Sequence, residues 1–492
     1  MYKESGKAGQ ERDLLEKARQ YEAVNRISDK EKPVFHVTPA VGWMNDPNGF
    51  SVYQGKIHLF YQYYPYDTQW GPMHWGHQVT EDMVYWQECK AALAPDEEYD
   101  KGGCFSGSAI ETDEGHVLLY TGVARDKEGQ EEQQNQCIAI GDGSDYKKTA
   151  ERPVITGEMM PEGFSRIDFR DPKVWKDGDS YYLAAGSRDK HGNGQIVLFS
   201  SADLYDWTYE GILAHSGGEI GSMWECPDFF ALDGADVLIC SPQDMKAQGY
   251  EFHNGNNALY FLGSYDKEQK IFTKEKPVSL DYGLDFYAPQ TTCLPDGRRV
   301  LIAWMQSWDN PYIPAGQKWK GMMTLPRELS VKNGRLFQRP VRELECYWKN
   351  KICYEKERIE GERQFQGVSG RVIDFTVIIL SGSFREFIID VAGNEEYFTR
   401  FTFNKEKSII EIDRTYSGVT RDIVCIRRAK MISSWESIKL RFIMDKNSVE
   451  LFVNDGEMVL STVIYTPLQA QDIRFVCDGS AVVDIEKYDI GQ

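Results

Sequence analysis

The chain has 492 residues, of which 13% are aromatic and 41% are hydrophobic, enough for about two or three domains with packed cores. Its formal net charge of −20 argues against nucleic acid or an anionic membrane surface as the main partner, because both require clustered Lys and Arg. A neutral ligand is compatible with this charge.

The first residues, Met-Tyr-Lys-Glu-Ser-Gly-Lys-Ala, lack the apolar core of about 7–15 residues that marks a secretory signal. No run of about 18 apolar residues that could span a membrane follows. The ten cysteines include no Cys-x-x-Cys pair, which favours reduced thiols over disulfides or a zinc site. The sequence therefore predicts a cytoplasmic protein without a membrane or nucleic-acid partner, as a monomer or a homodimer.

Residues 1–34 are highly charged and are predicted to be a helical leader. Leu14, Leu15, Ala18 and Tyr21 recur at helical spacing, which indicates a short amphipathic helix. The alternative is a disordered leader.

Residues 35–340 contain five copies of a β-rich unit. Each of the first four opens with a short motif: Trp-Met-Asn-Asp-Pro-Asn-Gly at 43–49, Phe-Ser-Gly at 105–107, Phe-Arg-Asp-Pro at 169–172 and Trp-Glu-Cys-Pro at 224–227. Each copy reaches a glycine turn, at Gly55, Gly115, Gly178, Gly234 and Gly297, and then an apolar run. The turn intervals are 60, 63, 56 and 63 residues. Repeated hairpin units at such a period predict a five-bladed β-propeller.

The phase of the repeat predicts a common site. Asp46, Ser106 and Glu225 each lie nine residues before their turn glycine, and Asp171 lies seven before. Equivalent positions in radial repeats lie at equivalent depths, so these side chains should meet at one end of the central channel. Carboxylates around one pocket are what glycoside cleavage requires.

The residues beside these acids sharpen the hypothesis. Asp46 and Asp171 each precede a proline, which favours extended backbone at inner-strand ends, although an Asp-Pro pair is also common in ordinary turns. Glu225 lies between Trp224 and Cys226, and we expect an apolar setting that favours its protonated form. Arg170 is expected either to hold an acid or sugar hydroxyls, or to form an ion pair between blades.

The segment Trp70-Gly-Pro-Met-His-Trp-Gly-His77 brings together two indoles and two imidazoles. His74 and His77 lack a third ligand at suitable spacing, so no metal is predicted. Aromatic faces that cover a sugar, or plain packing between blades, are the alternatives.

Two further regions complete the chain. Residues 341–354 have a helix-like pattern and are predicted to be a connector. From residue 355 to 492, alternating strands such as 437–444 and 449–453, separated by turns at Asp445-Lys-Asn and Asn454-Asp-Gly, predict a β-sandwich.

From about residue 35 to its end, the chain resembles glycoside hydrolase family 32, the β-fructofuranosidases. The motifs that carry the resemblance are WMNDPNG at 43–49, WGPMHWGH at 70–77, FSGSA at 105–109, FRDP at 169–172, WECPD at 224–228, DFYAPQ at 285–290 and LPREL at 325–329. The family fold, a five-bladed propeller followed by a β-sandwich, agrees with the layout predicted from the repeats.

The resemblance implies a role for each matching residue. Asp46 would be the nucleophile, Glu225 the general acid and then base, and Asp171 the stabiliser of the transition state. The residues implied to bind the fructosyl unit are Trp43, Asn45, Gln62, Trp70, Phe105, Ser106, Arg170, Tyr287 and Trp304. No metal or organic cofactor is implied.

The resemblance also implies the reaction. A retaining enzyme would hydrolyse the terminal non-reducing β-D-fructofuranoside bond of sucrose or a related small fructoside through a covalent fructosyl-enzyme. Sucrose 6-phosphate and short fructo-oligosaccharides remain alternative substrates; Arg188 and Lys190 are candidates for a phosphate contact. The alternative hypotheses are a propeller that cleaves arabinosides or xylosides, a fructosyltransferase, and a propeller that binds sugar without catalysis.

Overall fold

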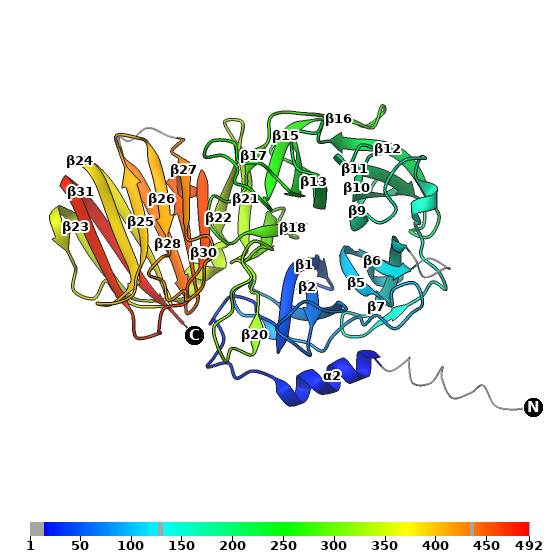
Figure 1. Ribbon diagram of the computed structural model, residues 1–492, viewed down its shortest axis with the longest axis horizontal. Coiled ribbons are helices and arrows are strands. Elements are labelled where there is room, and N and C mark those ends of the chain that lie inside the picture. The colour runs from blue at the N-terminus through cyan, green and yellow to red at the C-terminus, as the bar shows by residue number, and fades with distance from the viewer. Residues whose placement is uncertain (1–13, 126–130, 433–436, 492) are drawn as a thin grey trace, which may run out of the picture.

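The computed structural model describes residues 14–125, 131–432 and 437–491, and it is built almost wholly of β-strands. A propeller and a sandwich lie side by side (Figure 1). A short helix, α2 (Leu14–Asn25), comes first and lies below the first blade in this view. Its Glu22 accepts the N–H of Ala91, and its Arg19 donates to the carbonyl of the same residue. The predicted fold class, including the helix, is confirmed; residues 1–13 of the predicted leader lie outside the described residues.

The propeller has five blades of antiparallel strands; blade 4 has a fifth strand, and one additional strand pairs parallel with the first strand of blade 1. Blade 1 contains β1 (Gly42–Tyr53), β2 (Lys56–Tyr64), β3 (His74–Thr80) and β4 (Gln87–Glu88). Blade 2 contains β5 (Gly103–Thr112), β6 (Gly115–Arg125), β7 (Glu132–Gly141) and β8 (Tyr146–Lys148). Blade 3 contains β9 (Phe169–Asp177), β10 (Ser180–Arg188), β11 (Gly194–Ser201) and β12 (Trp207–His215). Blade 4 contains β13 (Met223–Leu232), β14 (Ala235–Gln243), β15 (Leu259–Asp266), β16 (Ile271–Lys274) and β17 (Val278–Ser279), and blade 5 contains β18 (Tyr287–Cys293), β19 (Arg299–Trp304), β21 (Arg327–Lys332) and β22 (Arg335–Pro340).

Two features of the repeat shape this ring. The five turn glycines predicted from the sequence all have positive φ, between 62° and 132°, and each joins the first and second strands of its blade. Glycine adopts this backbone region without the steric penalty that a Cβ brings. The ring closes where β20 (Trp319–Lys320), which follows β19 in the chain, pairs parallel with β1 in blade 1.

The first strand of every blade is irregular near its start. Each carries a β-bulge, where an extra residue interrupts pairing with the second strand. The bulged segments are Asn45–Asp46, Ser106, Asp171–Pro172, Cys226–Pro227 and Ala288–Pro289. Proline fits these positions because it has no N–H to contribute to the ladder.

The sandwich is one continuous sheet that folds over itself. Its strands are β23 (Trp348–Arg363), β24 (Ile373–Gly393), β25 (Thr399–Asn404), β26 (Ile409–Asp413), β27 (Ile426–Lys430), β28 (Ile438–Asp445), β29 (Ser448–Val453), β30 (Met458–Val463) and β31 (Asp472–Ile490). The first half of the long strand β24 pairs with β28, and its second half pairs with β25. Strand β31 pairs with both halves of β24, so the two long strands pass from one layer to the other.

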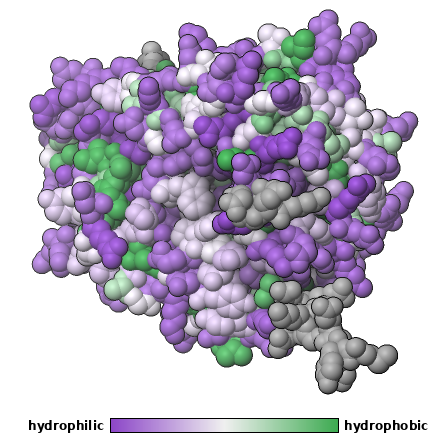
Figure 2. Space-filling model, turned by 45° about the vertical axis from the view of Figure 1, so that its right-hand side comes forward, coloured by the Kyte–Doolittle hydropathy of each residue, from purple (hydrophilic) through white to green (hydrophobic). Residues whose placement is uncertain are grey.

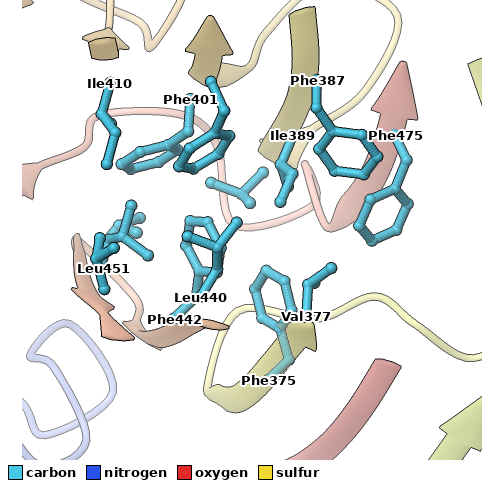
Figure 3. Close-up of a cluster of buried hydrophobic side chains, with 14 of the residues drawn as sticks. Phe375, Val377, Phe387, Ile389, Phe401, Ile410, Leu440, Phe442, Leu451 and Phe475 are labelled. Atoms are coloured by element: carbon cyan, nitrogen blue, oxygen red, sulfur yellow. The ribbon is translucent and has the colours of Figure 1, made fainter. Parts of the chain in front are cut away.

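Apolar side chains from the two layers meet in the sandwich core (Figure 3). Phe375 stacks on Phe442 within one layer, with ring centroids 4.6 Å apart. Phe401 reaches Phe442 from the other layer at 5.1 Å, edge to face. Along each of these strands, residues buried in the core alternate with residues that face outward. This is the period of two expected for strands with one buried face.

The junction between the domains differs from the sequence expectation. A 3₁₀ helix occupies Arg342–Tyr347, within the predicted connector. Strand β23 then begins at Trp348, before residue 355, because Trp348 already pairs with Ile490 at the end of the chain. Short-range pattern could not reveal a partner so distant in sequence.

A buried ionic network joins the two domains. Arg327 of the propeller donates through Nε to Glu450 of the sandwich at 3.0 Å, and both side chains are fully buried. Glu450 also accepts the N–H of Leu325 and lies 3.0 Å from His36 Nε2. Burial alone would lower the pKa of His36, but Asp445 and Glu450 outweigh it and raise that pKa to about 9. His36 is therefore charged at neutral pH and helps to bind two acids of the sandwich.

The surface fits the acidic composition. The face in Figure 2 is largely hydrophilic, and its apolar residues lie in small separate groups. Within the described ranges, no helix has the length and apolar character needed to cross a membrane.

We expect Glu450→Ala to lower the free energy of unfolding by about 3–5 kcal/mol, because it leaves Arg327 buried without its main anionic partner. Glu411→Ala, which breaks the exposed pair with Arg428, is the matched control and should cost less than about 1 kcal/mol. Denaturant unfolding of both variants measures the difference. Equal losses would show that the network does not hold the domains together.

Candidate active site

The predicted site residues converge on one pocket at an end of the propeller ring. Asp46, Ser106, Asp171 and Glu225 lie on β1, β5, β9 and β13, the first strands of four consecutive blades. All four line a pocket of about 440 Å³. Asn45, Gln62, Trp70, Phe105 and Arg170, also predicted from the sequence, line the same pocket.

The bulges of the first strands aim these side chains. Asp171 and Cys226 have φ of 64° and 50°, the left-handed region that residues other than glycine rarely adopt. The N–H of Asp171 donates to Thr121 Oγ1 of blade 2 at 3.0 Å, and the N–H of Cys226 donates to Asp171 Oδ2 at 2.9 Å. Hydrogen bonds between blades therefore hold the strained backbone in place.

Asp46 is held by two donors. Ser106 Oγ donates to its Oδ2 at 2.7 Å, and Asn45 Nδ2 donates to its Oδ1 at 3.0 Å. Burial, together with the nearby charge of Glu225, raises the pKa of Asp46 to about 6. Its carboxylate is thus ionised and oriented at neutral pH.

Asp171 lies in the same buried acidic cluster. Burial and the charge of Glu225 raise its pKa to about 7, against the opposing influence of Arg170. The Cys226 thiol lies 3.8 Å from Asp46 Oδ2 and 3.7 Å from Asp171 Oδ2. Burial and these acids raise the pKa of the thiol well above its usual value, so Cys226 is an uncharged separator between the two carboxyls.

Glu225 has polar partners, and the apolar setting expected from Trp224 and Cys226 is wrong. Arg170 Nε donates to its Oε1 at 2.9 Å, whereas Gln243 Nε2 and the Tyr287 hydroxyl donate to its Oε2 at 2.8 and 2.7 Å. Neighbours in a strand point to opposite faces, so the flanking residues do not report what a side chain meets.

Arg170 links blades 3 and 4. Beyond its bond to Glu225, its Nη1 donates to Asp168 Oδ1 at 3.2 Å and to Gln134 Oε1 at 3.1 Å. The ion pair between blades and the contact with a pocket acid, weighed as alternatives from the sequence, are one and the same interaction.

Three predicted substrate-binding residues do not line the pocket but support it from behind. Trp43 Nε1 donates to Asn45 Oδ1 at 2.7 Å, and its ring stacks on Trp308 with centroids 6.0 Å apart. Trp304 is 1% exposed and packs against both indoles. Tyr287, also 1% exposed, contacts Glu225.

The WGPMHWGH segment divides between pocket and core. Trp70 lines the pocket and is 47% exposed, whereas Trp75 is fully buried in a core cluster. His74 Nδ1 donates to the carbonyl of Pro72, and His77 Nε2 lies 3.0 Å from His58 Nδ1. Among the residues that the structure describes, no three His, Cys, Asp or Glu side chains are grouped as metal ligands would be.

Sequence reasoning missed five pocket-lining residues: Glu132, Gln134, Ile167, Asp168 and Trp308. They come from strand starts and from connections between strands, away from the repeat motifs. Ile167 and Trp308 are 49% and 38% exposed, unusual for large apolar side chains in loops, but exposure is not visible in a sequence. Asp168 has a weak sequence signal, since it stands directly before Phe-Arg-Asp-Pro.

Of the two phosphate candidates, only Arg188 contacts a residue that lines the pocket, among the residues that the structure describes. Arg188 Nη1 donates to Asp168 Oδ2 at 3.3 Å, and its side chain is 34% exposed. Lys190 packs near Gly163 on the neighbouring loop. Neither residue lines the pocket itself.

We expect Asp171→Asn to stabilise the fold at alkaline pH, although it removes a carboxylate from the pocket. A raised pKa means that the folded state binds the proton of Asp171 more tightly than the unfolded state does. The contribution of the protonated carboxyl to the free energy of unfolding is therefore complete below the unfolded pKa and is lost as pH rises through about 7. The neutral amide should therefore add about 1–3 kcal/mol at pH 8 and nothing near pH 3.5. Asp113→Asn on an exposed turn is the control. Thermal unfolding that shows the same gain at both pH values would contradict this account.

Two family models match the chain in sequence. The N-terminal domain model of glycosyl hydrolases family 32 matches residues 36–340, and the C-terminal model of the same family matches residues 343–490. A raffinose invertase of Escherichia coli is 36% identical over 457 residues, which cover 92% of this chain and 93% of that protein. A sucrose-6-phosphate hydrolase of Escherichia coli is 35% identical over 467 residues, with coverage of 92% and 93%.

Solved structures agree with the sequence matches. A β-fructofuranosidase of family 32 from Bombyx mori has a TM-score of 0.82 and 30% identity, over 100% of this chain and 99% of that chain. A sucrose-6-phosphate hydrolase from Lactobacillus gasseri has a TM-score of 0.86 and 27% identity, over 100% and 98%. Because matches to both family domains, to close relatives and to solved structures each extend over nearly the whole chain, this chain belongs to glycosyl hydrolase family 32.

Proposed function

We propose that this protein is a retaining β-fructofuranosidase that hydrolyses the terminal non-reducing fructoside bond of sucrose or a related small fructoside. One observation carries the proposal: Asp46 and Glu225, on different blades, line one pocket of about 440 Å³, each held by donors from its surroundings. The activities in the names of the relatives, an invertase and a sucrose-6-phosphate hydrolase, support the same reaction class.

In the first step, Asp46 attacks the anomeric carbon of the fructosyl unit. Glu225 gives its proton to the glycosidic oxygen as the bond from that oxygen to the anomeric carbon breaks, so the leaving sugar departs neutral. A covalent ester between fructose and Asp46 results. Because the pKa of Asp46 is about 6, the rate should fall below that pH as the nucleophile takes up a proton.

In the second step, Glu225 takes a proton from a water molecule, which attacks the anomeric carbon and releases Asp46. Two displacements at the same carbon restore the original configuration. Asp171 accepts hydrogen bonds from fructose hydroxyls, and those bonds lower the barrier because they strengthen in the transition state. This mechanism uses no metal or organic cofactor.

The mouth of the pocket suits a sugar as leaving group. Trp70, Ile167 and Trp308 line it and are each more than a third exposed, so they can cover the apolar face of a sugar ring. Sucrose 6-phosphate is the second candidate substrate, since Arg188 stands beside the pocket-lining Asp168. A cytoplasmic location and a monomeric or homodimeric state remain predictions.

The proposal is tested by which substrates are cleaved and by the anomer in which fructose is first released. Sucrose, sucrose 6-phosphate and kestose are compared by kcat/KM, and sucrose cleavage is followed by NMR in its first minutes. We expect β-fructose before mutarotation, because two displacements through a covalent intermediate retain the configuration of the anomeric carbon. Retaining enzymes hold their two carboxyl groups about 5–5.5 Å apart. An initial α product would indicate an inverting enzyme, and sugar binding without turnover would indicate a binding propeller.

Asp46→Asn should fold normally and lose more than about 10³-fold of kcat on sucrose, because an amide cannot form the fructosyl ester. Its side chain retains the size needed to meet Ser106 and Asn45. Asp113→Asn again serves as the control and should keep wild-type activity. A loss of less than about tenfold would remove Asp46 from the role of nucleophile.

Glu225→Gln should lower kcat/KM most for substrates with a poor leaving group. The variant cannot protonate the departing oxygen, so kcat/KM on sucrose should fall by about 10²–10⁴-fold. An aryl β-fructofuranoside needs little protonation and should be cleaved comparatively well in its first step. Equal losses on the two substrates would mean that Glu225 only binds.

A further inference from the structure

The two oxygens of the Glu225 carboxyl are not equivalent. Oε1 accepts one hydrogen bond, from Arg170 Nε at 2.9 Å. Oε2 accepts two, from Gln243 Nε2 at 2.8 Å and from the Tyr287 hydroxyl at 2.7 Å. Gln243 had no place in the sequence prediction, and it is absent from the pocket lining.

A carboxylate oxygen has about two lone-pair sites. The two donors fill both sites of Oε2, whereas among the residues that the structure describes only Arg170 donates to Oε1, which leaves the second site of Oε1 for a proton. We propose that Gln243 is a positioning residue which, with Tyr287, occupies Oε2, so that the catalytic proton is carried on Oε1. This inference rests on the proposed role of Glu225 as acid and base.

Gln243 is well placed for this task by strand register. Glu225 on β13 pairs directly with Ser241 on β14, and Gln243 follows two residues later on the same face. Such a diagonal neighbour lies within reach of a long side chain. The carbonyl of Gln243 also accepts the N–H of Ser222 at 2.9 Å, which fixes its backbone at the end of β14.

Tyr287 alone could not reserve Oε2 as firmly. Its hydroxyl has one proton and two acceptors nearby, Glu225 Oε2 at 2.7 Å and the carbonyl of Ser241 at 3.1 Å. When that proton turns to Ser241, Gln243 still donates to Oε2. An amide donor also does not ionise, so it serves equally at every pH of the reaction.

The chemistry then has a defined route. The proton leaves Oε1 for the glycosidic oxygen as the bond to the anomeric carbon breaks, and Glu225 becomes a carboxylate. In the second step Oε1 takes a proton from the attacking water as the fructosyl ester breaks. A proton on Oε2 would instead lie on the side occupied by Gln243 and Tyr287 and would be of no use to the leaving group.

Gln243→Leu tests the inference, because leucine removes the donor without adding charge. We expect kcat/KM on sucrose to fall by about 10–100-fold with KM changed by less than about twofold, since Gln243 does not line the pocket. On an aryl β-fructofuranoside we expect a loss of less than about threefold.

Gln243→Met, which keeps the length of the side chain, is the second variant should leucine disturb folding, and thermal unfolding checks both. Gln248→Leu is the matched control: this exposed glutamine follows β14, and its amide donates to the carbonyl of Glu219 at 3.5 Å. Equal losses on both substrates, a rise in KM, or unchanged kinetics would overturn the inference. Wild-type protein that cleaves neither substrate would instead overturn the proposed function.

Discussion

Closure of the five-bladed ring is the constraint on which the site depends. Asp46 and Glu225 are separated by almost 180 residues in sequence, yet Cys226 lies within 3.8 Å of Asp46 Oδ2. No local structure could produce that proximity. The parallel pairing of β20 with β1 completes the ring, and the bulges then turn a side chain from each first strand toward a shared pocket.

The pocket concentrates negative charge at a cost in stability. Asp46 and Asp171 are buried, and burial with the charge of Glu225 raises the pKa of both. Donors from several blades offset part of this cost: Ser106 for Asp46, the backbone of Cys226 for Asp171, and Arg170 for Glu225. Preorganised donors of this kind do not need to rearrange during the reaction, which is how polar sites in enzymes gain rate.

The sandwich supports the propeller through two of the motifs that identify the family. Arg327, in LPREL, binds Glu450, and the carboxylate of Asp285, in DFYAPQ, receives Arg414 and the N–H of Val463. Conspicuous motifs thus serve the domain interface as well as the pocket. By contrast Gln243, which we place next to Glu225, the proposed acid and base, lies outside the motifs that carry the family resemblance.

The sequence by itself determined the repeat, the turn glycines, the three acids with their phase, and the sandwich that follows. These features are local or periodic: a turn needs positive φ at glycine, and equivalent positions in repeated blades share a depth. The sequence also contained information about Gln243, because residues two apart in a strand lie on the same face of the sheet. That information could not be used before the structure showed the bulge at Cys226–Pro227, which sets the pairing of β13 with β14.

Only the tertiary structure decided the surroundings of those residues. It replaced the expected apolar setting of Glu225 with three donors, from Arg170, Gln243 and Tyr287, which come from three blades. It placed Trp304 behind the pocket and Trp308 on its wall, and it began β23 at Trp348 because the partner strand ends the chain. The physical reason is common to all of these: each depends on contacts between residues far apart in sequence, which periodicity and neighbouring residues do not encode.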